Sequence, residues 1–207
     1  RRKNPDDRLI SALVNIHDPG DQLSDREILG MIFLLLFAGH ETSVNLISSG
    51  ILALLEHPDQ FKKLHDNPEL IESAIEELLR HSSPVVYGAS RFPTEDVMIG
   101  DTLVPKNTEV IGVLSSANRD ESVFENPNNI DITRSPNKHI AFGAGRHFCI
   151  GVWLARLEGK IAINALIRRF PQLRLAVPRE KLRWRVRQTS ALRGLEDLPL
   201  TLTNPAL

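Results

Sequence analysis

The feature that most constrains this fold is a single helical pattern that runs from Ser24 to Glu56. Ser24 and Glu27 form a Ser-x-x-Glu capping box at its start, and His57–Pro58 ends it because the residue before a proline avoids helical geometry. A helix over residues 24–56 would be about 50 Å long and would have to cross a whole domain. Its first half is apolar nearly all round, so we expect this helix to be central and buried.

Apolar residues at helical spacing predict further helices on both sides of this one. The expected ranges are residues 6–16, 58–65, 67–80 and 150–169. Residues 85–113 are instead rich in Val, Ile, Thr, Gly and Pro, which predicts short strands and turns. The segment 118–139 is polar and irregular, and long segments of this kind are often functional. We therefore expect a mainly α fold with small β-sheets.

Charge and cysteine content exclude several classes of protein. Lys and Arg number 25 and Asp and Glu number 26, so nothing draws the chain as a whole to nucleic acid or to an anionic membrane. The longest apolar run, Ile28 to Ala38, is too short to span a bilayer. The one cysteine, Cys149, can form no disulfide within the chain, which fits a reducing compartment. We expect a cytoplasmic protein with neither nucleic-acid nor membrane partners.

Cys149 stands in the segment Phe142-Gly-Ala-Gly-Arg-His-Phe-Cys-Ile-Gly151 at the start of a predicted helix. Free N–H groups and the helix dipole favour an anion at that place, and the glycines let the backbone approach a flat ligand. Arg146 and His147 add positive charge. The simpler interpretation is a glycine turn followed by a small buried cysteine, and the residues alone leave both open.

The segment Ala38-Gly-His-Glu-Thr42 interrupts the apolar part of the long helix. Polar residues after a glycine inside a buried helix are locally inconsistent, which is typical of functional sites. Thr42 can divert a hydrogen bond from the helix and open a bend where a small molecule or water fits. The alternative is that Glu41 and Thr42 lie on a solvated face.

Glu77 and Arg80 stand at positions i and i+3 of a predicted helix, where their side chains face the same side. Alone, such a spacing more often marks an exposed ion pair of little energetic weight.

These three segments, in the order 38–42, 77–80 and 142–151 along the chain, resemble the cytochrome P-450 family of haem-thiolate monooxygenases, of the soluble bacterial type. In that family the Glu-x-x-Arg pair locks a second Arg, and the resemblance implies Arg134 of the irregular segment as the first candidate here, with Arg119 in reserve. The resemblance covers residues 1–207 and corresponds to the C-terminal half of the family's single domain, with the cysteine loop placed before the helix 150–169. It implies an enzyme that inserts one atom of O2 into a small organic substrate, with haem b as cofactor. It also implies that the native polypeptide contains an N-terminal half.

The resemblance assigns roles residue by residue. Cys149 would be the axial ligand of the iron, and Phe142 would shield its sulfur. Thr42 would hydrogen-bond dioxygen, and Glu41 would relay protons. Positions that match cofactor contacts are Gly143 and Ala38, and Arg91 and His147 for the haem propionates. Positions that match the substrate pocket are Val85, Val86 and Tyr87, and the segment 189–192.

No flavin or nicotinamide fingerprint follows a strand, so we expect electrons to come from a separate protein. The resemblance implies a ferredoxin-like or flavodoxin-like donor, with NAD(P)H as the ultimate source. Lys138, Arg146, Arg156 and Lys160 could form a cationic patch for that partner, although an ordinary solvated face is the simpler interpretation.

Two other functions compete with the monooxygenase. The chain could be a haem-free, non-catalytic fragment of such an enzyme. Alternatively, Cys149 could be a nucleophile served by His147, although no orienting group is evident in the sequence.

Overall fold

The computed structural model describes residues 4–15, 23–185 and 191–202. These divide into two compact units, residues 1–41 and 42–207. The helix α2 (Asp25–Glu56) continues without a break through the boundary. Its bounds confirm the predicted long helix.

The first unit holds α1 (Leu9–Val14) and the first half of α2. The capping box is confirmed, because the Ser24 N–H donates to Glu27 Oε2 at 2.8 Å and the Glu27 N–H donates to Ser24 Oγ at 3.3 Å. The expected burial of this half is wrong. Phe33, Leu36 and Phe37 are 71%, 68% and 63% exposed, because the described residues contain nothing that covers them.

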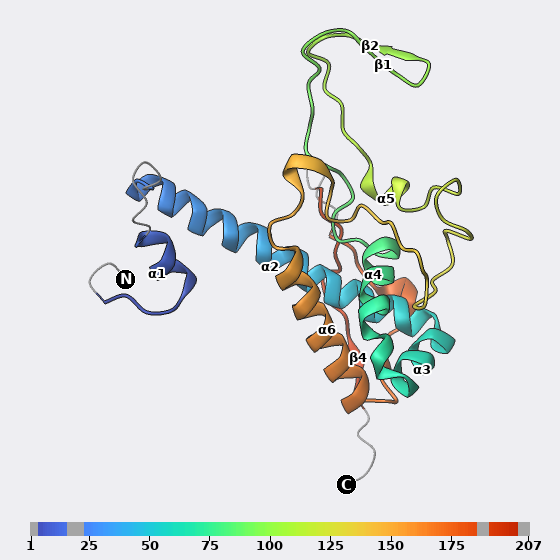
Figure 1. Ribbon diagram of the computed structural model, residues 1–207. Coiled ribbons are helices and arrows are strands. Elements are labelled where there is room, and N and C mark those ends of the chain that lie inside the picture. Colours follow the sequence, from blue (N-terminus) through green and yellow to red (C-terminus); the bar gives the residue numbers. More distant parts are fainter. Residues whose placement is uncertain (1–3, 16–22, 186–190, 203–207) are drawn as a thin grey trace. The chain divides into compact units, whose positions relative to one another are not determined.

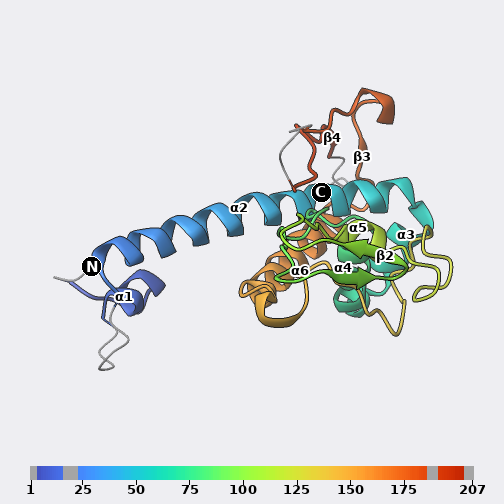
Figure 2. The same cartoon turned by 90° about the horizontal axis from the view of Figure 1, so that it is seen from above.

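The second half of α2 is buried between two groups of elements, as Figure 2 shows. One group contains the helices α3 (Pro58–Asp66), α4 (Ile71–His81) and α6 (Val152–Arg169), which close the main core with Ile51 and Leu54 of α2. On the other side Leu52 packs against Leu182 and Leu195. The helix is therefore the element around which the second unit is built.

Between α3 and α4 lies a short 3-10 turn, η1 (Pro68–Leu70), so the helix expected at 67–80 begins with this turn. Figure 1 shows α4 and α6 side by side. The remaining helical turns are α5 (Leu114–Ala117), η2 (Gly145–His147) and η3 (Arg179–Lys181). The helix expected at 150–169 is confirmed as α6.

The strands are short, as the composition of the middle of the chain predicts. Strands β1 (Val97–Ile99) and β2 (Thr102–Val104) form an antiparallel hairpin in which Val97 faces Val104. Strands β3 (Arg174–Leu175) and β4 (Leu200–Thr201) form a second antiparallel pair. Single bridges add the pairs Val85–Leu192, Tyr87–Val113, Arg91–Val110 and Trp184–Leu195. A mainly α fold with small sheets is therefore observed.

By length and composition alone, α2 is long and apolar enough to cross a membrane. It is the one such helix among the residues that the structure describes. The central helix of a soluble protein meets the same criterion, and the second half of α2 lies in the core of its unit.

The close approach of the C-terminal segment to α2 yields a prediction about Gly194. A Cβ added at Gly194 would lie 2.1 Å from Oδ1 of Asn45, which is itself buried. We expect Gly194→Ala to lower the free energy of unfolding by about 1–3 kcal/mol, since the amide would have to shift within a packed interior. Gly112→Ala is the control, because an added Cβ there meets no atom within 4 Å. Equal denaturant midpoints for the two variants would contradict the observed packing.

Candidate functional site

The loop that carries Cys149 is closed by its own backbone. The Cys149 N–H donates to the carbonyl oxygen of Phe142 at 3.1 Å, and the Gly143 N–H donates to the carbonyl oxygen of Ile140 at 2.9 Å. Gly143 and Gly145 have φ angles of +74° and +72°, in the left-handed region that residues with a side chain rarely adopt. The glycines therefore determine the path of the loop.

Cys149 lies three residues before the first residue of α6, whose N-cap is Gly151. Its side chain is half-buried, and the free N–H groups of the first helical turn make this end of α6 favourable for an anion. A Cβ added at Gly151 would lie 3.9 Å from the Cys149 sulfur, so the absence of a side chain keeps space beside the thiol. Arg146 and His147 are exposed.

Phe142 is held by a group of rings and one cation. Its ring centroid lies 6.4 Å from that of Phe148 and 6.2 Å from that of His139. The guanidinium of Arg156 lies 5.2 Å from the Phe142 centroid. Phe142 also packs against the main core, so the carbonyl that binds the Cys149 amide is anchored to the body of the second unit.

The donor set fits haem better than a bare metal ion. Within residues 4–15, 23–185 and 191–202, no group of three or more His, Cys, Asp or Glu side chains could hold a metal. A single thiolate suffices for haem iron, because the macrocycle provides the equatorial ligands. The half-buried thiol and the glycine-lined loop are consistent with such a group.

The polar segment of α2 falls at the boundary of the two units. Ala38 and Glu41 belong to the first unit and Thr42 begins the second. Glu41 and Thr42 are both partly buried. The next residue, Ser43, donates a hydrogen bond to Glu158 of α6, so α2 is tied directly after Thr42 to the helix that follows Cys149. The roles of Ala38, Glu41 and Thr42 remain predictions.

Arg91 and His147, the proposed propionate ligands, are both exposed. Arg91 exchanges backbone hydrogen bonds with Val110 at 2.9 and 2.8 Å, and its side chain is exposed. The alternative of a cysteine nucleophile served by the exposed His147 stays a hypothesis. Both propionate roles remain predictions.

The candidate substrate residues are only partly described. Val85 lies opposite Leu192 in a single bridge, which brings the C-terminal segment beside the chain that follows α4. Thr189 and Ser190 lie outside the described residues.

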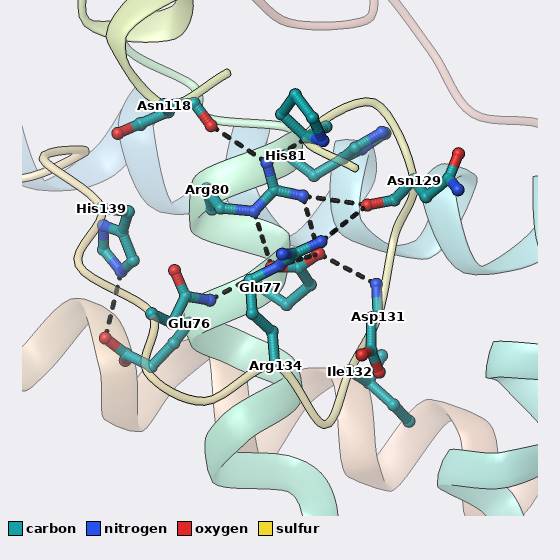
Figure 3. A network of polar contacts seen from close by, with 12 residues as sticks. Glu76, Glu77, Arg80, His81, Asn118, Asn129, Asp131, Ile132, Arg134 and His139 are labelled. Atoms are coloured by element: carbon teal, nitrogen blue, oxygen red, sulfur yellow. Dashed lines mark hydrogen bonds and ion pairs between the residues drawn. The ribbon is translucent and has the colours of Figure 1, made fainter. Parts of the chain in front are cut away.

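A buried ion pair stands at the centre of the network in Figure 3. Glu77 and Arg80 are both fully buried, and Nε and Nη2 of Arg80 each donate to a different oxygen of Glu77 at 2.7 Å. The remaining Arg80 donors reach the carbonyl oxygens of Asn118, Pro127 and Asn129 at 2.7–3.0 Å. The pair therefore binds the irregular segment 118–134 to α4.

Arg134, the first candidate, is the third member of this network. Its Nε lies 3.1 Å from Glu77 Oε2. Arg119 binds elsewhere, donating to the carbonyl oxygen of His81 at 2.8 Å and to Asn128 Oδ1 at 3.0 Å. Burial, with the nearby cations Arg119 and Arg80, lowers the pKa of His81 to about 4, so this histidine is neutral at neutral pH.

Of the four residues that could form a cationic patch, two are engaged in ion pairs with α4. Arg156 binds Glu76 through two hydrogen bonds of 2.7 and 2.6 Å, and Lys160 binds Glu72 at 2.9 Å. Lys138 and Arg146 are exposed. The sequence did not single out Glu76 or His139 as part of the site. Their only signal is that Glu76 precedes Glu77 and that His139 precedes the cysteine loop.

Comparison with known proteins gives consistent results. The family model described as "Cytochrome P450" matches residues 1–185. PksS, a polyketide-biosynthesis cytochrome P450 of Bacillus subtilis, is 49% identical over 203 residues, which are 98% of this chain and 50% of that protein. CYP107DY1 of Priestia megaterium is 48% identical, over 97% of this chain and 48% of its own length. The solved structure of PksS superposes with a TM-score of 0.92 at 47% identity, covering 98% of this chain and 52% of that one. The chain thus spans about half the length of these relatives.

Because Glu77 and Arg80 are buried together, we expect a large loss of stability when one carboxylate oxygen of Glu77 is replaced by an amide nitrogen. We expect Glu77→Gln to lower the free energy of unfolding by about 3–5 kcal/mol, because it leaves the Arg80 charge buried without a counter-charge. Glu72→Gln, also on α4 but at an exposed ion pair, should leave the denaturant midpoint nearly unchanged. A Glu77→Gln midpoint equal to that of the control would show that the pair is not needed for stability.

Proposed function

Because this chain belongs to the cytochrome P450 family, we propose that it forms the C-terminal half of a haem-thiolate monooxygenase that inserts one oxygen atom of O2 into a small organic substrate. The observation that carries the proposal is Cys149, half-buried at the start of α6 in a loop shaped by two left-handed glycines.

The cysteine loop, together with Arg91 and His147, would hold the cofactor. The Cys149 sulfur would bind the haem iron, and Phe142, packed beside the loop, would keep water from that sulfur. Gly143 would leave room for the macrocycle, and Arg91 and His147 would bind its propionates. When bound, haem b with a thiolate ligand supplies the electron donation that favours cleavage of the O–O bond.

On α2, the Thr42 hydroxyl would donate a hydrogen bond to dioxygen, and the Glu41 carboxyl would hold a proton for delivery towards it. Their adjacent positions in a partly buried stretch of helix support this role. Ala38, one turn earlier, would leave space for the cofactor, and Gly39 between them has no atom within 4 Å of an added Cβ.

We further propose that an N-terminal half of the same polypeptide covers the apolar first half of α2. The exposed Phe33, Leu36 and Phe37 and the half-length match to relatives support this. Electrons would come from NAD(P)H through a ferredoxin-like or flavodoxin-like protein in the cytoplasm. Lys138 and Arg146 remain available for such a partner.

A second candidate is a haem-free fragment without catalytic activity, which the exposed apolar residues of α2 also favour. Haem content per purified chain separates the two candidates. One haem in each stable 207-residue chain would exclude the fragment without cofactor.

The haem ligand is tested in the full-length polypeptide by reduction under carbon monoxide. We expect the red-shifted Soret band of a thiolate-ligated haem, and we expect Cys149→Ala to abolish it because the variant lacks the proposed thiolate ligand. A parent protein with bound haem but no red-shifted band would overturn the proposed function.

Thr42→Ala tests the distal hydroxyl separately. The variant should keep the red-shifted band, while the product formed per NAD(P)H consumed falls by about tenfold or more, because proton delivery loses its hydrogen-bonding group. Oxygen, peroxide and product are measured together. Unchanged coupling would assign Thr42 a structural role only.

A further inference from the structure

Two adjacent carboxylates of α4 serve different parts of the second unit. Successive residues of a helix differ by about 100° in direction, so Glu76 and Glu77 point apart. Glu77 binds Arg80 and Arg134, whereas Glu76 turns towards His139 (Figure 3). Glu76 is not part of the buried ion pair, so its contacts must serve another purpose.

Glu76 accepts three hydrogen bonds from groups that flank the cysteine loop. Arg156 of α6 donates from Nε to Oε1 at 2.7 Å and from Nη2 to Oε2 at 2.6 Å. His139 Nε2 lies 3.1 Å from Oε2. The Ala141 N–H donates to His139 Nδ1, so Nδ1 is an acceptor and the ring hydrogen lies on Nε2, facing the carboxylate. His139 is 3% exposed.

The charge of Glu76 is secured by the same partners. Burial opposes ionisation, but the hydrogen bonds from His139 and Arg156 outweigh it and lower the pKa of Glu76 to about 2. The carboxylate is therefore ionised at any pH where the protein would work, and its bonds to both flanks are charge-assisted.

Both partners of Glu76 contact Phe142. The Arg156 guanidinium lies 5.2 Å from the Phe142 ring centroid, and the His139 ring lies 6.2 Å from it. Phe142 in turn accepts the Cys149 N–H on its carbonyl oxygen at 3.1 Å. A continuous set of contacts therefore joins the Glu76 carboxylate to the backbone of Cys149.

We propose that Glu76 is a positioning residue for Cys149, holding the sulfur in place through Arg156, His139 and Phe142. This rests on the proposed function, since its purpose is to keep the thiolate on the iron. Glu77 and Arg80 have the different task of fixing the irregular segment 118–134.

The chain offers a matched control for this proposal. Glu72 stands one turn earlier on α4 and also binds α6, through Lys160 at 2.9 Å. Glu72→Gln and Glu76→Gln each remove one negative charge and one ion pair between the same two helices. Only Glu76 is connected to the cysteine loop.

The test uses the haem-loaded, full-length polypeptide as its carbon monoxide complex. We measure the rate at which the red-shifted Soret band converts to the band without a thiolate ligand. Gln at position 76 is neutral and keeps one acceptor oxygen, so at least one of the three hydrogen bonds is lost and none stays charge-assisted. We therefore expect a conversion about tenfold faster or more in Glu76→Gln, and a rate within about twofold of the parent in Glu72→Gln. The unfolding temperature of each variant is measured together with this conversion rate.

A conversion rate of Glu76→Gln within about twofold of the parent overturns the proposal, whatever its unfolding temperature. Should Glu76→Gln fail to fold, Arg156→Lys decides instead, because it keeps the charge but loses the two-pronged contact with Glu76. Faster conversion in Arg156→Lys supports positioning, and an unchanged rate overturns it. A parent without the red-shifted band would refute the monooxygenase itself, which separates the two failures.

Discussion

The second unit depends on a carboxylate and a guanidinium that are buried together. Neither Glu77 nor Arg80 has contact with solvent, so every polar atom of the pair needs a protein partner. Carbonyl oxygens of residues 118–129 and the side chain of Arg134 meet that need. A long segment without regular structure is thereby given one path. That path places His139 and the cysteine loop beside the N-terminal start of α6.

Most of the helical frame could be predicted from the sequence, since it depends on local rules. The capping box at Ser24 and Glu27 and the stop at His57–Pro58 placed α2 within one residue. Periodicity placed α3 and α6 within two residues. The spacing of Glu77 and Arg80 predicted that they face the same side, and the structure adds that they are fully buried.

What the sequence left open depends on contacts between distant segments. The choice between Arg134 and Arg119 follows from the path of residues 118–134, which carry no periodic signal. Hydrophobicity predicted a buried first half for α2, but burial requires a covering surface, and none of the described residues provides one. Glu76 and His139 were missed for the same reason, because 63 residues separate them in the chain.

The division of labour between Glu76 and Glu77 bears on how this unit could be recombined with its relatives. The loop of residues 139–149 cannot be exchanged as an isolated segment. The residues that support it, at positions 76 and 156, lie on two separate helices. A chimera that imports another protein's cysteine loop would need to import those two positions as well. The set formed by Glu77, Arg80 and Arg134 could stay with the host. Recombination boundaries chosen from sequence segments alone would cut through the first set and leave the second intact.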